Sequence, residues 1–145
     1  MPDQSNNGQS MVDQNTAGHS TVGKVTRHNN VETGFFGQEI AQNFLCGKGM
    51  LLLESNFRMP TAEIDLIMRD GSYIVFVEVK YRKSLKYGLP REAVGIHKQR
   101  RIIKAALYYI ARHGLQDQCF RFDVLELLET TGCVEVNHIE NAFGV

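Results

Sequence analysis

Apolar side chains recur along the chain with two different spacings, which together predict two helices and five strands. Helical spacing predicts helices at residues 34–46, where Gly47 follows the last apolar position, and at residues 92–112. Runs rich in β-branched and aromatic residues predict strands at residues 50–58, 63–69, 73–82, 121–129 and 134–143. The order helix, three strands, helix, two strands predicts the α/β class, with a small mixed sheet and flanking helices.

The first 30 residues have a different composition from the rest of the chain. They contain no aromatic residue, no Leu and no Ile, and they are rich in Asn, Gln, Ser, Thr and Gly. Such a segment buries too little apolar surface to offset its chain entropy. We therefore expect a disordered leader at residues 1–30 and a single domain at residues 31–145. A start codon assigned upstream of the true one would also explain this composition.

The net charge alone indicates neither a nucleic-acid nor a membrane partner, because 16 Lys and Arg residues balance 16 Asp and Glu residues. No apolar run approaches the about 20 residues that cross a bilayer, so we expect no membrane partner. The three cysteines have neither CxxC nor Cys/His spacing, which argues against a disulfide framework or a structural zinc site. We expect a cytoplasmic protein, with the cysteines as buried apolar fillers and with His97, His113 and His138 on the surface or at helix caps.

The dipeptide Asp70-Gly71 separates two β-rich runs and predicts a hairpin in which Arg69 lies opposite Ser72. Opposed side chains share a face of a sheet, and side chains alternate with a period of two. This register places four charged residues on one side of the hairpin: Glu63, Asp65, Glu78 and Lys80. Asp65 and Glu78 become diagonal neighbours, about 7–8 Å apart at the backbone.

Carboxylates this close repel each other, and a bound cation is the usual remedy. Hard oxygen ligands in small number suit Mg²⁺ or Mn²⁺, which keep several waters and bind a substrate phosphate. Lys80, on the same face, can meet the negative charge that develops on a phosphodiester. The spacing fits metal-assisted phosphodiester hydrolysis. The alternative is a solvent-facing salt bridge, although the apolar strand around Glu78 and Lys80 makes two charges expensive there.

From residue 34 to the end, the chain resembles the YraN-like uncharacterised proteins, which are grouped with the PD-(D/E)XK, or restriction-endonuclease-like, nuclease superfamily. The matching stretches are Asn56-Phe57-Arg58, Glu63-Ile64-Asp65-Leu66-Ile67, Phe76-Val77-Glu78-Val79-Lys80, Tyr87-Gly88 with Pro90, Lys98-Gln99-Arg100-Arg101, Arg121-Phe122-Asp123-Val124 and His138-Ile139-Glu140-Asn141-Ala142-Phe143.

The resemblance implies a restriction-endonuclease-like fold, a metal-dependent DNA nuclease activity in recombination or repair, and a role for individual residues. Asp65 and Glu78 would be metal ligands, Lys80 the catalytic lysine, and Gln99 a further residue of the catalytic site. The family pattern has Gly-Glu in the first helix. Here Gln38 stands at the glutamate position and the acidic Glu39 follows it. A glutamine can bond a metal-bound water, but it brings no negative charge.

Basic residues concentrate between residues 80 and 112, where Glu92 is the single acid. Such a local charge is typical of a surface that follows a phosphate backbone. The candidate contacts to nucleic acid, most simply DNA, are Arg82, Lys83, Lys98, Arg100, Arg101 and Lys104. The alternative is a solvated helix face.

Three classes of function remain open at this point. The first is a metal-dependent nuclease that uses Mg²⁺ or Mn²⁺. The second is a binding module that has lost turnover and holds DNA or a DNA-processing protein partner. The third, a purely structural interaction protein, has only the neutral net charge in its favour.

Overall fold

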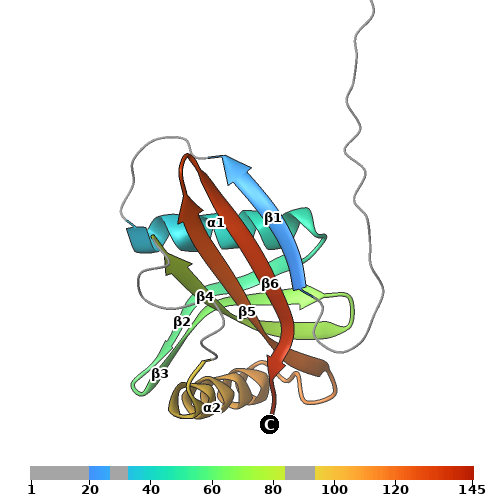
Figure 1. Ribbon diagram of the computed structural model, residues 1–145. Coiled ribbons are helices and arrows are strands. Elements are labelled where there is room, and N and C mark those ends of the chain that lie inside the picture. Colours follow the sequence, from blue (N-terminus) through green and yellow to red (C-terminus); the bar gives the residue numbers. More distant parts are fainter. Residues whose placement is uncertain (1–19, 27–32, 84–93) are drawn as a thin grey trace, which may run out of the picture.

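The computed structural model describes residues 20–26, 33–83 and 94–145, which form a six-stranded sheet with a helix on each face (Figure 1). The strands are β1 (Ser20–Thr26), β2 (Leu51–Met59), β3 (Ala62–Asp70), β4 (Tyr73–Arg82), β5 (Cys119–Thr130) and β6 (Cys133–Phe143). The helices are α1 (Thr33–Gly47) and α2 (Ile96–Arg112). The strand order is β1-β6-β5-β4-β3-β2. The predicted α/β class, with a small mixed sheet and flanking helices, is confirmed.

The connection between β4 and β5 makes the sheet mixed. These two strands are parallel, whereas the other neighbouring pairs are antiparallel. Parallel strands need a long crossover, and α2 lies in this one. Within the part of the chain that the structure describes, no helix is long and apolar enough to span a membrane.

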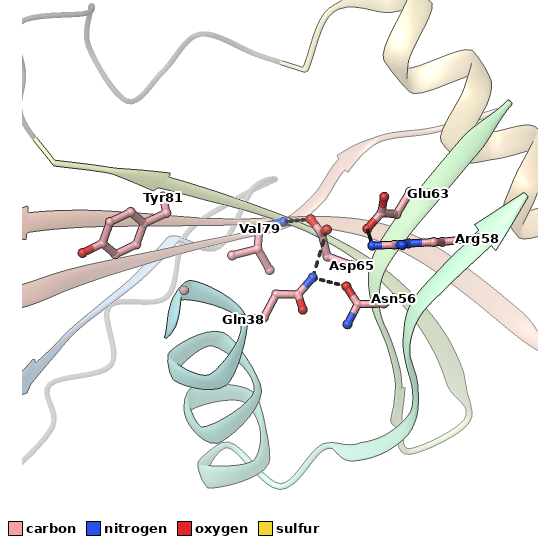
Figure 2. A pocket seen from close by; sticks show the side chains of 8 residues that line it. Gln38, Asn56, Arg58, Glu63, Asp65, Val79 and Tyr81 are labelled. Carbon is pink, nitrogen blue, oxygen red and sulfur yellow. Dashed lines mark hydrogen bonds and ion pairs between the residues drawn. The ribbon is translucent and has the colours of Figure 1, made fainter. Parts of the chain in front are cut away.

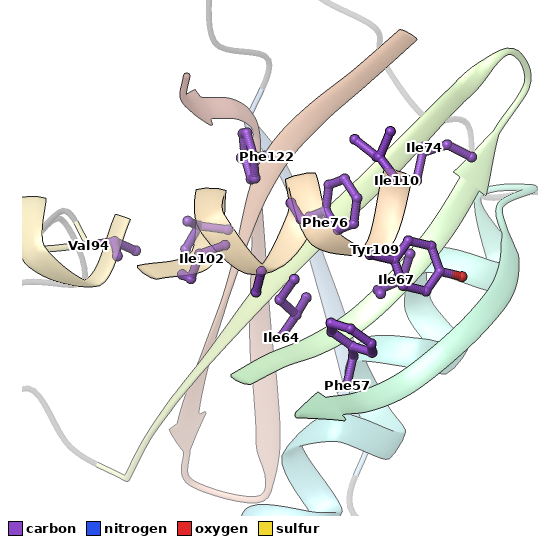
Figure 3. Close-up of a cluster of buried hydrophobic side chains, with 13 residues drawn as sticks. Phe57, Ile64, Ile67, Ile74, Phe76, Val94, Ile102, Tyr109, Ile110 and Phe122 are labelled. Atoms are coloured by element: carbon purple, nitrogen blue, oxygen red, sulfur yellow. The ribbon is translucent and has the colours of Figure 1, made fainter. Parts of the chain in front are cut away.

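Two separate hydrophobic clusters hold the helices on the sheet. Under α2, Ile102, Tyr109 and Ile110 pack on Ile64 and Phe76 (Figure 3). The cluster under α1 joins Ile40, Ala41 and Leu45 to Leu66, Val75, Val77, Leu125 and Leu127. Neighbouring residues of β4 therefore alternate between the two clusters, as a doubly covered central strand requires.

The structure corrects the predicted leader at seven residues, because Ser20–Thr26 forms β1 and pairs with β6. Four of its seven residues are β-branched, but the polar composition of the surrounding segment outweighs this weak strand signal, and its pairing partner lies far away in the sequence. Gly23 permits the approach of the strand, since a Cβ there would lie 2.7 Å from Cε2 of Phe44. The rest of the predicted leader, residues 1–19 and 27–30, lies outside the described residues.

The register of the β3–β4 hairpin also differs from the prediction. Asp70 pairs with Tyr73, so that the turn residues are Gly71 and Ser72 instead of Asp70 and Gly71. Gly71 has a φ of +57°, which suits a glycine in such a turn. The register moves by two residues, which keeps the paired residues from Leu66 to Val77 on their predicted faces. Helix α2 begins at Ile96, after Gly95, and not at residue 92.

A buried polar network ties β5 to β6. The Asp123 carboxylate accepts hydrogen bonds from His138 Nε2 at 2.8 Å, Arg121 Nε at 3.0 Å and the Asn141 backbone at 2.9 Å. Lys48 donates to Nδ1 of His138, because an ammonium can only donate. Asp123 and His138 are fully buried, so the expected surface or capping position of His138 is wrong. The cysteine expectation is also wrong, since Cys46 and Cys119 are exposed and Cys133 is half-buried.

We expect Asp123→Asn to lower the free energy of unfolding by roughly 3 kcal/mol at pH 7, because removing one partner of a buried pair leaves the other uncompensated. Urea denaturation measures this change. Asp117→Asn, at an exposed acid between α2 and β5, is the control and should change the free energy little. A loss below about 1 kcal/mol for Asp123→Asn would mean that the network contributes little.

The same variant should reveal a pH dependence. Burial tends to raise the pKa of Asp123, but hydrogen bonds from His138, Arg121 and the Asn141 backbone outweigh burial and hold the pKa below 3.8. A depressed folded-state pKa stabilises the fold above the unfolded-state pKa, and that contribution is lost as the pH falls through the folded-state value. The difference between the parent and Asp123→Asn should therefore be complete at pH 7 and shrink below about pH 3.9.

Candidate functional site

Asp65 marks the point where β3 and β4 separate. The last backbone pair between these strands in this direction is Leu66 with Val77. Beyond it, the Asp65 carboxylate takes the place of a strand carbonyl, because Oδ2 accepts the backbone N–H of Val79 at 2.8 Å. Oδ1 accepts a weaker bond from Gln38 Nε2 of α1 at 3.3 Å. A side chain therefore bridges the gap between two separating strands.

The alternation of side chains changes at the same point. Ile64 belongs to the cluster under α2, whereas Leu66, two residues later, belongs to the cluster under α1. In a regular strand these two side chains would share a face. On the neighbouring strand, Asn56 lies between the partners of Leu66 and Ile64 and has a φ of +53°, a left-handed conformation that asparagine tolerates best after glycine. Both strands are thus distorted beside Asp65.

This distortion lets Asp65 reach cavities on both faces of the sheet. On the α1 side is a cavity of about 710 Å³ (Figure 2), whose lining includes Gln38, Asn56, Glu63, Asp65 and Tyr81. On the α2 side is a cavity of about 280 Å³, lined by Ala62, Glu63, Asp65, Glu78, Lys98, Arg101 and Ile102. The structure thus brings three of the predicted acids around one cavity: Glu63, Asp65 and Glu78.

Glu78 is the buried member of this group, with 6% of its side chain exposed. Burial raises its pKa, the hydrogen bond from Lys98 opposes the rise, and the negative charge of Asp65 adds to it. The ion pair with Lys98 joins β4 to the first turn of α2. If the β3–β4 register is continued by one residue beyond the pair of Leu66 and Val77, Asp65 lies opposite Glu78 and not diagonal to it. The shifted register therefore explains why the two acids are close.

Two predicted catalytic residues lie outside the lining of both cavities. Lys80 is half-buried and lines neither of these two cavities. It lies beside Glu126 on β5, its partner in the β4–β5 register, and is within electrostatic reach of Glu78. Burial lowers the pKa of Lys80, and the charge of Glu126 opposes that change. Gln99 also lines neither cavity, because its side-chain amide donates to the carbonyl of Val94 at 2.7 Å.

The accessory residues divide in the same way. Gln38 reaches from α1 into the larger cavity, where its Nε2 donates to Asn56 Oδ1 at 2.7 Å (Figure 2). Glu39 is exposed and does not line that cavity, as expected from its 100° rotation along the helix. Glu63 forms an exposed ion pair with Arg58 at 3.5 Å. Asn56 was assigned no role by sequence reasoning, although an asparagine within a strand is itself a signal.

The predicted nucleic-acid contacts also lie in different places. Lys98 and Arg101 line the smaller cavity. Arg100 and Lys104 are exposed on α2 but line neither of the two cavities. At the end of β4, Arg82 is half-buried and Lys83 is exposed. Two cations therefore stand at the mouth of an acidic cavity, and the other four lie beyond its lining.

The donor set fits a divalent cation that keeps part of its hydration. Asp65 and Glu78 supply hard carboxylate oxygens from adjacent strands. In the ranges 20–26, 33–83 and 94–145 no group of three or more His, Cys, Asp or Glu side chains forms a ready-made metal cage. The remaining ligands would have to be water, backbone or substrate oxygens, which is the binding mode that Mg²⁺ prefers.

Comparisons with known proteins identify similar chains. The profile of the uncharacterised protein family UPF0102 matches residues 37–127. A UPF0102 protein of Clostridioides difficile (strain 630) is 45% identical over 117 residues, which are 79% of this chain and 99% of the relative. One from Geotalea daltonii is 46% identical over 118 residues, covering 81% of this chain and 93% of the relative.

Asp65→Asn tests the acidic pair. Because the charge of Asp65 raises the pKa of Glu78, removing that charge should lower the pKa of Glu78 toward 4.5, which an NMR titration of the carboxyl carbon measures. Affinity for Mn²⁺, measured by calorimetry, should fall at least about tenfold. Without metal, the free energy of unfolding should stay within about 1 kcal/mol of the parent, since relief of repulsion offsets one lost acceptor.

Glu39→Gln is the matched control, because it removes an acid from α1 outside the larger cavity. It should change neither the pKa of Glu78 nor the affinity for Mn²⁺. Equal Mn²⁺ affinity in Asp65→Asn and the parent would assign Asp65 a purely structural role.

Proposed function

Because this chain belongs to the uncharacterised protein family UPF0102, the YraN family of the restriction-endonuclease-like nuclease superfamily, we propose that it is a metal-dependent nuclease. Its substrate would be DNA, and its reaction the hydrolysis of phosphodiester bonds. The observation that carries this proposal is the pair formed by Asp65 and Glu78 where β3 and β4 separate, with Lys98 and Arg101 at the same cavity.

In this proposal each charged group has a separate task. Asp65 and Glu78 would hold Mg²⁺ or Mn²⁺, which when bound supplies Lewis-acid stabilisation of charge on the phosphoryl oxygens. Lys98 and Arg101 would hold the phosphate backbone at the cavity mouth, since guanidinium and ammonium groups are the usual phosphate contacts. Lys80 would add positive charge beside Glu78 as negative charge develops on the phosphate.

The exposed cations of α2 support a DNA substrate. Arg100 and Lys104 extend the positive charge of Lys98 and Arg101 along the helix, and Lys83 adds to it at the end of β4. A cationic surface that continues from a metal site suits a polymer of phosphates better than a small phosphate ester.

The direct test incubates the purified protein with single-stranded, duplex and branched DNA in Mn²⁺, Mg²⁺ or EDTA. We expect cleavage that requires the metal. Lys80→Ala should bind Mn²⁺ like the parent but cleave on the order of 100-fold more slowly, because it removes a charge that acts in the transition state. Lys80→Arg, which keeps the charge, should retain part of the rate. Undiminished cleavage by Lys80→Ala would remove this lysine from the mechanism.

A second candidate function is a DNA-binding module without turnover, which acts with a DNA-processing protein partner. The observation in its favour is Gln38, an uncharged amide whose Nε2 points at Asp65 where a third acid would add to the metal site. Binding that ignores EDTA, with no cleavage under any condition, would support the module and contradict the nuclease.

Gln38→Glu tests whether the missing negative charge at this position limits metal binding and cleavage. A carboxylate beside Asp65 should tighten Mn²⁺ binding by about tenfold or more and raise the cleavage rate. Gln42→Glu adds the same charge one helical turn later and is the control. If Gln38→Glu binds Mn²⁺ no more tightly than Gln42→Glu, Gln38 does not face the metal site.

A further inference from the structure

Glu78 already has a cationic partner, and that partner is Lys98. The Lys98 ammonium contacts Oε1 of Glu78, and both residues line the cavity on the α2 side. The two side chains differ in exposure: 6% for Glu78 and 48% for Lys98. The ion pair therefore joins a fixed, buried carboxylate to an ammonium that stands at the cavity mouth on a flexible four-carbon stem.

The Lys98 ammonium contacts a carboxylate that a divalent cation at this cavity would also use. A buried carboxylate next to a second carboxylate needs positive charge, and Lys98 supplies it at Oε1, one of the two Glu78 oxygens available to a metal. Binding of Mg²⁺ or Mn²⁺ to Asp65 and Glu78 is therefore an exchange of one cation for another. The incoming ion must displace the ammonium from Glu78 or share the carboxylate with it.

The position of Lys98 in its helix makes the ammonium easy to release. It lies in the first turn of α2, which contains no acidic residue and has Gly95 at its N-cap without a side-chain capping bond. A helix N-terminus carries partial positive charge and disfavours a cation. The contact with Glu78 is what compensates Lys98 for this position. Once a metal ion neutralises Glu78, both the ion and the helix end repel the ammonium.

We infer that Lys98 is an exchangeable counter-ion of the acidic pair, which divalent metal releases so that it can bind a DNA phosphate. Arg101 lines the same cavity one helical turn later, so the released ammonium and the guanidinium form a two-cation phosphate contact. Metal binding thus precedes full phosphate binding. The phosphate half of this inference rests on the proposed function, whereas the exchange half rests on the ion pair alone.

The first experiment titrates Mn²⁺ into the parent, Lys98→Met and Arg112→Met by calorimetry, without DNA. Lys98→Met keeps the length of the side chain and removes the competing cation, so it should bind Mn²⁺ about tenfold more tightly than the parent. Arg112→Met removes one positive charge from the last turn of the same helix and should leave the affinity within about twofold.

Thermal unfolding checks the exchange independently of titration. Without metal, Lys98→Met should have a lower Tm than the parent, because Glu78 loses its counter-charge. Saturating Mn²⁺ should raise the Tm of Lys98→Met more than that of the parent. In the variant the metal supplies a counter-charge that Glu78 lacks, whereas in the parent it must first displace the Lys98 ammonium. Lys98→Gln, which can still donate a hydrogen bond, provides a second variant if Lys98→Met does not fold.

The second experiment measures DNA affinity against salt concentration, with EDTA and with a fixed Mn²⁺ concentration. With EDTA, Lys98 is held by Glu78, so the parent and Lys98→Met should have equal slopes of log K against log salt. With Mn²⁺, the slope of the parent should be steeper than that of Lys98→Met by about 1, the value for one additional phosphate contact. Comparing variants at the same ion concentration removes the effect of Mn²⁺ on DNA itself.

The outcomes separate this inference from the proposed function. If the parent binds Mn²⁺ and Lys98→Met binds it no more tightly than Arg112→Met, the exchange is wrong and the nuclease proposal stands. If neither the parent nor Lys98→Met binds Mn²⁺, the metal-dependent function fails together with the exchange. Tighter Mn²⁺ binding with equal salt slopes in Mn²⁺ would confirm the exchange and overturn the phosphate contact.

Discussion

The hydrogen bond from the Val79 backbone to the Asp65 carboxylate is the constraint on which the candidate site depends. Two strands that stop pairing inside a sheet leave backbone groups without partners, and each such group must find another. Asp65 satisfies one of them and is thereby fixed in the gap. Its position brings it next to Glu78, opens a cavity on each face, and leaves the α1 side within reach of Gln38. The hydrogen bond that satisfies the Val79 backbone N–H therefore also fixes the position of a candidate metal ligand.

The rest of the sheet supports this gap through well-packed hydrophobic clusters on both faces. Two hydrophobic clusters fix α1 and α2 independently, so each helix can present a polar residue to the gap without depending on the other. The Asp123 network performs the corresponding task between β5 and β6, where the strand register shifts beside Asp123. A carboxylate thus fills a local irregularity of the strand pairing twice in one sheet: half-buried Asp65 beside the candidate metal site, and fully buried Asp123 beside a histidine and an arginine.

Periodicity predicted what depends on neighbouring residues and missed what depends on distant ones. The two helices and five of the six strands follow from local patterns. The predicted proximity of Asp65 and Glu78 also holds, because a register error of two residues changes which residues pair but still leaves these two acids neighbours. Strand β1 has β-branched residues but no large apolar one, and a partner more than 100 residues away holds it, so its local pattern was too weak to predict a strand. The Lys98–Glu78 and His138–Asp123 pairs could not be predicted for the same reason. Each pair joins side chains on two different elements, and residue spacing along one element does not show which other element packs against it.

The left-handed conformation of Asn56 has a consequence at the boundary of the sheet. Strand β2 is an edge, and it begins with three exposed leucines, Leu51, Leu52 and Leu53. An apolar edge of this kind is a template on which strands of other molecules can assemble. Asn56 interrupts it after five residues, because its backbone leaves the extended conformation, and the register already shifts between Leu52 and Glu54. A foreign strand would find only a short flat stretch to pair with, so the residue that lines the cavity also limits the length of the edge open to strand addition.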